Sequence, residues 1–496
     1  MTFGCRLNRA EALDEEARLS AAGHTLIPLG TGPTQMGTGP EKKGTAPEKK
    51  GTNPKQVGPG PLPPDVIIVR CCSVTAKAQR DCEKTIKKLQ FLHPQAQIIL
   101  TGCHPNAHPI PLSGIGLSSP QMGTGPERTG STQMGTDPER MGTGPLSTPI
   151  PLKTSRAYLK VQDGCSGKCA FCIVPQFRGS PRSVPFEHVL ARAQVFLSAG
   201  FRELVVTGCN LALYRNVGKG LPELLTALAQ LSPTDSGTDP TKMGTGPTVY
   251  LGTGPEKMGT GPFHRIRLGS IEPGICDSKL LSVLAKTYNI CSFLHLSLQS
   301  ASNHVLKSMN RPYTIEQVSA FCQAAQQTVG KRLAFGVDLI AGFPGETLAD
   351  HEETCRFLSE WGQAPNQLAP NQLEWGQAPQ GVWGQAPNPF VNLHVFPYSE
   401  RPGTPAATMP GAVPRAERLR RARELEAIGH ANRLRFAAGF LNQEVEVCVE
   451  KDGNGWTSEY FRCLLPPGLP RRRLVKARVT AVTADVLTAT DVRILS

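Results

Sequence analysis

Hydrophobic positions along the chain switch repeatedly between short apolar runs and stretches in which apolar side chains recur at helical spacing. Near the N-terminus, residues 9–22 and 76–92 show the helical spacing, whereas residues 65–70 and 96–102 are short apolar runs. The first pattern predicts amphipathic helices and the second predicts buried strands. Strands that alternate with helices are typical of an α/β domain with a parallel sheet, so we expect such a domain over residues 1–110.

The same alternation resumes after residue 154 and predicts a second, larger domain over residues 154–410. Its predicted strands are residues 158–161, 203–207, 265–268, 294–298, 333–340 and 391–396. Its predicted helices are residues 186–199, 221–231, 278–287, 315–328 and 348–360. Six strand–helix units make a partial, open (β/α)6 barrel, a fold that carries its chemistry at the carboxyl ends of the strands.

The last part of the chain changes character. Three short apolar runs separated by turn residues predict strands of a small C-terminal β-barrel over residues 440–496. These runs are residues 444–449, 475–482 and 486–488. A basic helical stretch over 415–437 precedes them, within a predicted helical linker (411–439), and a second linker (111–153) joins the two α/β units.

Low-complexity blocks interrupt this pattern. The chain has 50 glycines and 44 prolines among 496 residues, and many of them repeat in units such as Gln-Met-Gly-Thr-Gly-Pro-Glu-Arg. The blocks are residues 31–63, 120–145, 236–262 and 361–388. Such composition sustains neither a helix nor a central strand, and the unit lacks the apolar positions that a stacked repeat buries. We therefore expect flexible inserted loops rather than a solenoid.

Charge and cysteine content narrow the class of protein. The formal net charge of +13 favours a polyanionic partner such as a nucleic acid. The sequence has no apolar run long enough for a membrane span and no apparent signal peptide, so we expect a cytoplasmic protein without a membrane partner. Fifteen cysteines in such a chain indicate metal or redox use more than a disulfide framework.

Three cysteines lie on one loop just after a predicted strand. Cys165, Cys169 and Cys172 have C-x3-C-x2-C spacing, and this loop carries no histidine. Three thiolates on one loop can hold three irons of a [4Fe–4S] cluster and leave the fourth iron open for a ligand. Zinc, which more often takes paired cysteines or cysteine with histidine, and unliganded thiols are the alternatives. Phe171 would shield a cluster on one side.

These residues and three other motifs resemble the radical S-adenosylmethionine (SAM) methylthiotransferases. The matching segments are residues 164–183, 296–302, 338–347 and 396–404. The resemblance implies that Cys165, Cys169 and Cys172 form the catalytic cluster site that binds SAM and supports formation of a 5′-deoxyadenosyl radical. It also implies a second [4Fe–4S] cluster, which holds or donates the sulfur, on the matching residues Cys5, Cys72 and Cys103. Cys71 precedes Cys72 and is an alternative ligand.

The subgroup follows from two shorter matches. Residues 73–78 and 178–183 resemble the branch that acts on N6-threonylcarbamoyladenosine at position 37 of tRNA. The implied reaction places a methylthio group on C2 of that adenosine, with a second SAM as methyl donor. We expect a tRNA anticodon loop as substrate, an electron donor such as flavodoxin or ferredoxin, a sulfur donor, and a monomer. Alternatives are isopentenyladenosine, a ribosomal protein, or a non-catalytic iron–sulfur RNA-binding role.

Further candidate residues flank the predicted strand ends. The expected SAM-pocket residues are Thr207, Gly208, Glu272, Gln299, Gly342, Gly345 and Glu346. For Gly342 and Gly345 the alternative is a tight turn, because glycine permits both a turn and a close backbone approach. We expect several arginines to bind RNA phosphates: Arg178, Arg182, Arg420, Arg421, Arg471, Arg472 and Arg473. For Arg178 and Arg182 the carboxylate of SAM is an alternative ligand. The C-terminal barrel resembles the TRAM module, an RNA-binding barrel; a solvated basic surface is the alternative.

Overall fold

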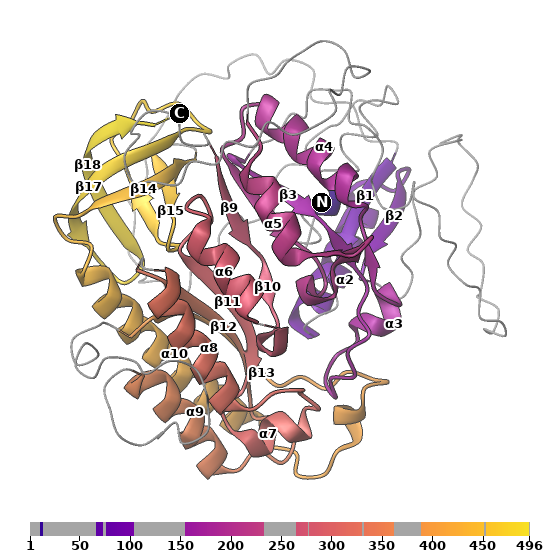
Figure 1. Cartoon of the computed structure of the whole chain (residues 1–496). Coiled ribbons are helices and arrows are strands. Elements are labelled where there is room, and N and C mark those ends of the chain that lie inside the picture. The colour runs from indigo at the N-terminus through magenta and orange to yellow at the C-terminus, as the bar shows by residue number, and fades with distance from the viewer. Residues whose placement is uncertain are drawn as a thin grey trace, which may run out of the picture.

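The computed structural model describes residues 10–12, 66–72, 76–103, 154–232, 264–275, 277–329, 332–361, 388–450 and 453–495. Apart from Trp361 and Asn388, the four low-complexity blocks lie outside these residues, and their predicted flexibility stays a prediction. Figure 1 shows an N-terminal unit in indigo and a C-terminal unit in yellow against a barrel coloured magenta to orange. The α/β fold class and the small C-terminal barrel are thereby confirmed.

The N-terminal unit is a parallel strand pair with one helix. Strands β1 (Val66–Cys71) and β2 (Gln97–Gly102) pair in parallel, and the crossover between them is helix α2 (Ala76–Leu92). Alternate positions of β1 pack against α2 in a small apolar cluster that includes Val69, Cys71 and Leu89. Residues 10–12 are helical, in agreement with the first predicted helix, whose other residues lie outside the described part.

The barrel consists of two parallel sheets that follow one another. The first sheet is β3 (Arg156–Lys160), β6 (Glu203–Thr207) and β9 (Arg265–Leu268). The second is β10 (Ser270–Ile271), β11 (Phe293–Gln299), β12 (Ala334–Ala341) and β13 (Phe390–Pro397). A parallel bridge between Ile266 and Ile290 continues the strand order from one sheet to the other. The described strands therefore form a half-open barrel, as the alternation predicted.

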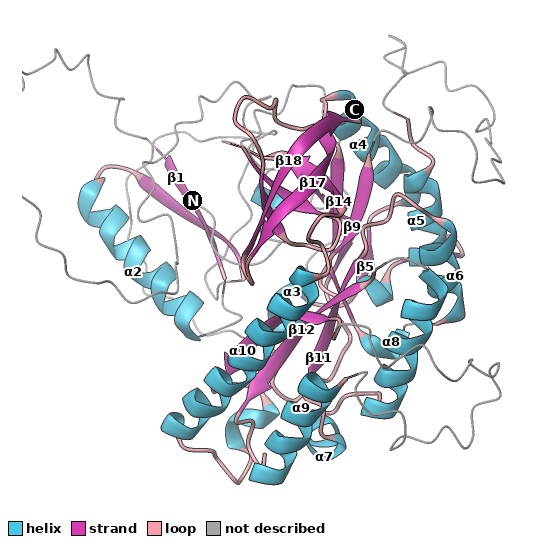
Figure 2. Cartoon of the chain, turned by 90° about the vertical axis from the view of Figure 1, so that its left-hand side faces the viewer, coloured by secondary structure: helices cyan, strands magenta, loops and turns pink. Residues whose placement is uncertain are grey.

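Helices cover the outer face of the barrel, as Figure 2 shows. They are α4 (Phe186–Ser198), α5 (Leu221–Ala229), α6 (Ser278–Lys286), α8 (Ile315–Val329) and α9 (Leu348–Glu360). Leu294, Leu296 and Leu298 of β11 pack with leucines of these helices in the main core. Because side chains alternate along a strand, the intervening positions face the barrel interior. On β11 these positions include the buried polar residues His295 and Gln299.

Several short elements were not predicted. Between the barrel strands these are α3 (Val174–Arg178), the hairpin pieces β4 (Gln162–Asp163), β5 (Arg182–Ser183), β7 (Arg215–Asn216) and β8 (Lys219–Gly220), and α7 (Asn303–Ser308). Each has six residues or fewer, too short for a periodic hydrophobic pattern to be recognised.

The C-terminal unit begins with a long helix and ends in a closed barrel. Helix α10 (Arg415–Ala438) leads into β14 (Glu444–Val449), β15 (Asn454–Thr457), β16 (Arg462–Leu464), β17 (Leu474–Val482) and β18 (Val486–Ile494). The barrel closes in the order β14-β15-β16-β18-β17. Helix α10 buries Leu425 in the main core, and its Gly429 allows Leu393 of β13 to approach closely. The predicted linker is therefore a packed helix of the barrel layer.

Candidate functional site

The three cysteines of the C-x3-C-x2-C loop follow the end of β4 and precede α3. Gly164, just before Cys165, has a φ of +69°, and a Cβ there would collide with the carbonyl of Ser180. The Gly167 N–H donates to Cys165 Sγ at 3.3 Å. A Cβ on Gly167 would lie 3.2 Å from Cys165 Sγ and 3.8 Å from Cys169 Sγ. Glycine at this position therefore leaves the space between two of the sulfurs open.

The spacing of the sulfurs distinguishes a cluster from a single metal ion. Three thiolates on one zinc ion lie about 3.8 Å apart, given tetrahedral angles and a Zn–S bond of about 2.3 Å. Among the described residues, the sets whose ligand atoms lie within 4.8 Å of one another are His295–Asp338–His394 and His351–Cys355–Glu424. The cysteine triplet is not among them, so at least two of its three sulfurs lie more than 4.8 Å apart, farther than two ligands of one zinc ion. This donor set fits an iron–sulfur cluster.

Arg311 connects the cysteine loop with the strand ends. Its Nη1 donates to Cys169 Sγ at 2.9 Å, and its Nη2 lies 3.2 Å from Glu272 Oε1. Burial raises the pKa of Cys169, and Arg311 opposes this shift; burial also raises the pKa of Cys172 to about 11. A bound metal must therefore displace protons from these thiols. Sequence reasoning missed Arg311, because it lies in a loop after α7 with no motif spacing to the cysteines.

The predicted strand-end residues occupy neighbouring ends of the barrel sheet. Asn210 Nδ2 donates to Glu272 Oε2 at 2.8 Å, which joins the end of β6 to the end of β10. Thr207 is buried, and its carbonyl accepts the Val161 N–H at 2.9 Å. A Cβ on Gly208 would lie 3.0 Å from the Gln162 side chain. Gln299 ends β11 with a φ of +73°. The structure brings Glu272 to the cysteine loop through Arg311.

The Gly342–Glu346 loop is held closed by its own carboxylate. Gly342 and Gly345 have φ values of +73° and +81°. The carboxylate of Glu346 accepts the Gly342 N–H and pairs with Arg421 Nη1 at 3.1 Å. Burial raises the pKa of Glu346, although Arg421 opposes this shift. Both turn formation and a close approach of a ligand are compatible with this loop.

Arg421 and Arg178 correct the prediction that they contact RNA phosphates. Arg421 is buried and donates to Glu417 and to the backbone carbonyl of Glu346. Arg178 pairs with Glu11 Oε1 at 2.7 Å and with Asp163 Oδ1 at 3.1 Å. Its Nε donates to Cys103 Sγ at 3.2 Å. Both guanidinium groups are thus committed to buried partners, because each lies where two elements pack together.

The other predicted RNA-binding arginines differ in exposure. Arg182 is exposed, with Asp163 Oδ2 at 3.8 Å, and Arg420 is exposed between Glu417 and Glu424. Arg471 and Arg473 are exposed beside the C-terminal barrel. Arg472 donates to the Ala199 carbonyl at 2.9 Å and stacks over Phe201, so it docks this barrel onto α4.

The second cysteine set lies at the ends of β1 and β2. Cys72 and Cys103 are buried, and the Cys103 N–H donates to the Cys71 carbonyl at 3.1 Å. Cys5 lies outside the described residues. Cys71 packs in the α2 core, and a hydrogen bond with the Cys82 thiol, the largest cause, raises its pKa. Cys71 and Cys72 therefore face opposite sides of the strand, and Cys71 is a core residue.

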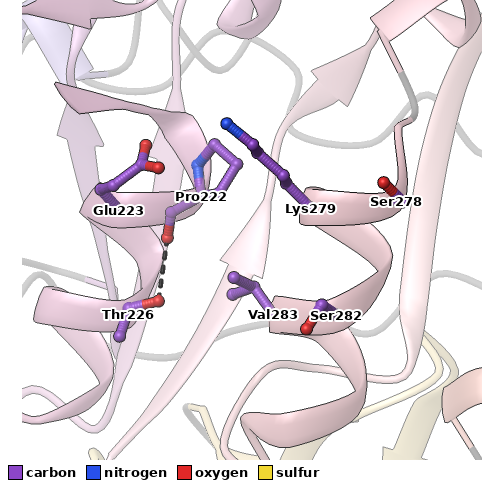
Figure 3. Close-up of a pocket in the computed structure, with 7 residues that line it drawn as sticks. All are labelled: Pro222, Glu223, Thr226, Ser278, Lys279, Ser282 and Val283. Carbon is purple, nitrogen blue, oxygen red and sulfur yellow. Dashed lines mark hydrogen bonds between the residues drawn. The ribbon is translucent and has the colours of Figure 1, made fainter. Parts of the chain in front are cut away.

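A groove on the outer helices lies apart from these sites. It has a volume of about 300 Å³ and lies between α5 and α6, as Figure 3 shows. The residues that line it are Pro222, Glu223, Thr226, Ser278, Lys279, Ser282 and Val283. None of the predicted site residues lines it. Across the described part of the chain, no helix combines the length and apolar character that crossing a membrane requires.

Comparison with known proteins agrees with this geometry. Residues 159–358 match the model of the radical SAM superfamily, which implies SAM and a [4Fe–4S] cluster. Residues 55–115 match a family described as uncharacterized protein family UPF0004. The barrel and its cysteine loop thus define a radical SAM protein with an additional N-terminal domain.

Individual relatives narrow the family. A threonylcarbamoyladenosine tRNA methylthiotransferase MtaB of Rickettsia prowazekii is 28% identical over 84% of this chain and 88% of the relative. A tRNA-2-methylthio-N(6)-dimethylallyladenosine synthase of Erythrobacter litoralis is 28% identical over 60% of this chain and 55% of the relative. The chain thus combines a radical SAM domain with a UPF0004 domain and is similar over most of its length to curated tRNA methylthiotransferases.

Among solved structures, one match is the cobalamin-dependent S-adenosylmethionine radical enzyme OxsB in its apo form. It has 13% sequence identity and a TM-score of 0.39, and the match covers 74% of this chain and 48% of OxsB. The chain therefore spans less than half the length of that structure.

Proposed function

We propose that this protein is a tRNA methylthiotransferase that adds a methylthio group to C2 of N6-threonylcarbamoyladenosine at position 37. The observation that carries the proposal is the adjacency of the two cysteine sets. Arg178 contacts Cys103 of the N-terminal set and Asp163, two residues before Cys165 of the barrel set. A reaction that moves sulfur to a carbon activated by a SAM-derived radical needs the two sites to lie beside one another.

The cysteines divide into two proposed cluster sites. Cys165, Cys169 and Cys172 would hold the [4Fe–4S] cluster that binds SAM, and Cys5, Cys72 and Cys103 would hold a second [4Fe–4S] cluster. When bound, these groups would supply the radical that removes the aromatic hydrogen and the sulfur that takes its place on the carbon. The proposed domain boundaries are those expected from the sequence, with the C-terminal barrel as a TRAM-like domain.

The chain's own residues position and shield the site. Arg311 fixes Cys169 relative to Glu272, and the Glu346–Arg421 pair holds the Gly342–Gly345 loop. Phe171 packs with Phe343 and Tyr398 in a cluster beside the cysteine loop, which excludes water from one side. We propose that Thr207, Gly208, Glu272, Gln299, Gly342, Gly345 and Glu346 line the SAM pocket.

The proposed substrate sets the proposed partners. The exposed Arg182, Arg420, Arg471 and Arg473, with the overall charge of +13, suit the phosphates of tRNA. Bases of an anticodon loop can be splayed out of the stack, which gives access to C2 of the adenine. An electron donor such as flavodoxin or ferredoxin and a sulfur donor complete the reaction. We expect a monomer in the cytoplasm, where tRNA is available.

Mass spectrometry of tRNA nucleosides tests the proposal. The host makes threonylcarbamoyladenosine but lacks its methylthiotransferase, and it expresses this chain or Cys169→Ala. We expect the methylthio nucleoside with the wild type and none with Cys169→Ala. Iron-loaded wild type without this product contradicts the proposed substrate. Methylthiolation of isopentenyladenosine instead favours the alternative substrate. The relative that acts on the dimethylallyl nucleoside matches a shorter part of this chain than the MtaB relative does.

A further inference from the structure

Helices α9 and α10 lie side by side against the barrel, and a polar cluster joins them (Figure 2). His351 and Cys355 are four positions apart on α9, so they lie on the same side of that helix, where they meet Glu424 of α10. His351 is 1% exposed, Cys355 is half-buried and Glu424 is exposed. The proposed function assigns no role to these three residues.

The three side chains point their ligand atoms at one another. His351 Nε2 lies 3.0 Å from Glu424 Oε2 and 3.4 Å from Cys355 Sγ, and all three atoms lie within 4.8 Å of one another. A tetrahedral zinc site has Zn–N and Zn–O bonds of about 2.0 Å and a Zn–S bond of about 2.3 Å. Its N···O distance is therefore about 3.3 Å and its N···S distance about 3.5 Å. Both distances from His351 are within a few tenths of an ångström of these values.

Hydrogen bonds alone do not satisfy this cluster. Both contacts are made by the same ring nitrogen of His351, and the other one, Nδ1, has no hydrogen-bond partner among the described residues. Nε2 of a neutral imidazole can donate to the carboxylate or accept from the thiol, but it cannot do both. A metal ion accepts a lone pair from all three groups at once.

A second cluster of ligand-type side chains, inside the barrel, is explained by hydrogen bonds. The Oδ1 atom of Asp338 lies 2.9 Å from His295 Nε2 and 3.3 Å from His394 Nδ1. One carboxylate oxygen can accept from both rings, so this cluster requires no metal ion.

The donor set between α9 and α10 favours zinc. Thiolate, imidazole and carboxylate are its protein ligands, whereas Mg²⁺ and Ca²⁺ take oxygen ligands. Zinc binds the thiolate, so the thiol proton is released on binding. Arg420 Nη1 also lies 3.0 Å from Glu424 Oε2, and it would give up this contact. Arg420 keeps two hydrogen bonds to Glu417, each at 2.8 Å, so the exchange leaves it paired.

We infer that His351, Cys355 and Glu424 bind one zinc ion, with a water molecule as the fourth ligand. The exposed carboxylate of Glu424 places the open position at the solvent side of the helix pair. The ion joins α9 to α10. Helix α9 starts shortly after Glu346, which pairs with Arg421 of α10, so the ion also strengthens the support of the loop that ends at Glu346. This inference does not depend on the proposed substrate.

Zinc binding to the full-length protein with reconstituted clusters tests the inference. The protein is freed of loosely bound metal with a chelator, dialysed to equilibrium against Zn²⁺, and analysed for zinc and iron. The variants are Cys355→Ser, Glu424→Gln and, as a matched control, Glu353→Gln at another exposed position of α9. Wild type and the control should bind one zinc ion per chain, and the other two variants should bind it at least about tenfold more weakly. An iron content equal to that of the wild type shows that a variant retains its clusters.

X-ray absorption at the zinc edge identifies the ligands. The inferred site gives one sulfur at about 2.3 Å together with nitrogen and oxygen at about 2.0 Å. A shell of three sulfurs would place the zinc at the cluster cysteines and overturn the inference. No bound zinc in wild type at micromolar free Zn²⁺, or equal zinc affinity in all variants, would also overturn it and leave the cluster as a polar contact between two helices.

Discussion

Two buried charge networks join the small domains to the barrel, and they differ in what receives the arginine donors. The N-terminal network joins Glu11, Arg70, Lys160, Asp163 and Arg178, and one of its donors ends on Cys103 Sγ.

In the C-terminal network the acceptors are two carboxylates, Glu203 and the more exposed Glu446 at 3.3 Å from Arg265 Nη1, and main-chain carbonyls. Arg265 and Arg267 both donate to Glu203 at 2.7 Å, and Arg267 also donates to the carbonyls of Thr457 and Ser458. Backbone carbonyls are neutral acceptors with fixed positions.

The C-terminal network therefore has a structural role, whereas the N-terminal network also contacts a proposed cluster ligand. Among the described residues, the cations of the N-terminal network share two carboxylates, and Arg178 also directs its Nε at the Cys103 thiol. Such a charge stabilises the thiolate form or an anionic cluster attached to it. The C-terminal network satisfies its donors within the protein, and we expect it to contribute to docking alone.

The largest expected effect is on stability at the C-terminal network. Glu203→Gln removes the carboxylate that two buried guanidinium groups share and leaves Arg265 with the more exposed Glu446 at 3.3 Å, which should cost about 3–5 kcal/mol. Urea unfolding of the full chain measures this loss. The control is Glu187→Gln, because Glu187 is exposed on α4 with a loose pair to Lys219 at 3.6 Å. An unchanged midpoint for Glu203→Gln would show that the carbonyl acceptors suffice.

Glu11→Gln should cost less and act locally. Burial raises the pKa of Glu11, but Lys160, Arg178 and Arg70 together hold it well below its ordinary value. We expect a loss of about 2–3 kcal/mol that loosens β1 and α2 while the C-terminal barrel keeps its protection. Hydrogen exchange followed by mass spectrometry resolves the two regions. Uniform loss of protection would contradict the division into two networks.

Arg178→Lys tests whether the N-terminal network affects the reaction as well as stability. Lysine keeps the charge but cannot contact Glu11, Asp163 and Cys103 together. Methylthio product should fall about tenfold or more, whereas SAM cleavage at the barrel cysteines should change less than about twofold. The matched change in the other network, Arg267→Lys, should alter stability but not this ratio. Equal loss of both activities would assign Arg178 a general structural role.

The smallest effect is a pH dependence at the C-terminal side. Burial lowers the pKa of His264, adjacent to Arg265, to about 4, and its Nε2 lies 3.0 Å from the Leu228 carbonyl. Because the folded pKa is below the unfolded value of about 6.5, its stabilising contribution is complete above pH 6.5 and falls toward pH 4. Wild type should lose about 1 kcal/mol between pH 7 and 5.5, and His264→Phe should lose less. His188→Gln, at an exposed position, should behave as wild type.

The pattern of hydrophobic residues was sufficient to predict the bounds of several helices and strands. Helix α2 and strands β6 and β9 have the predicted bounds, because buried leucine, isoleucine and valine positions decide them. Strands β15 and β16 were missed, since asparagine, glycine and arginine dilute their pattern. The proposed cluster ligands were predicted from the spacing of the cysteines and from family resemblance.

The charged partners could not be predicted in the same way. Glu11 and Arg178 are 167 positions apart, and only the packing of two units brings them together. Arg311 reaches Cys169 across 142 positions. Arg178 and Arg421 were expected at an RNA surface because sequence reports charge but not burial.

The places where the repeat blocks enter the barrel have a practical consequence. One block falls between the end of α5 and the start of β9, and another between the end of α9 and the start of β13. Both junctions run from a helix to the amino end of a strand, on the face opposite the strand ends that carry the site. After insertions of more than twenty residues, β9 still pairs in regular register with β6, and β13 pairs with β12 with one irregularity at Phe335. The same two junctions are therefore suitable positions for an affinity tag or a fluorescent label.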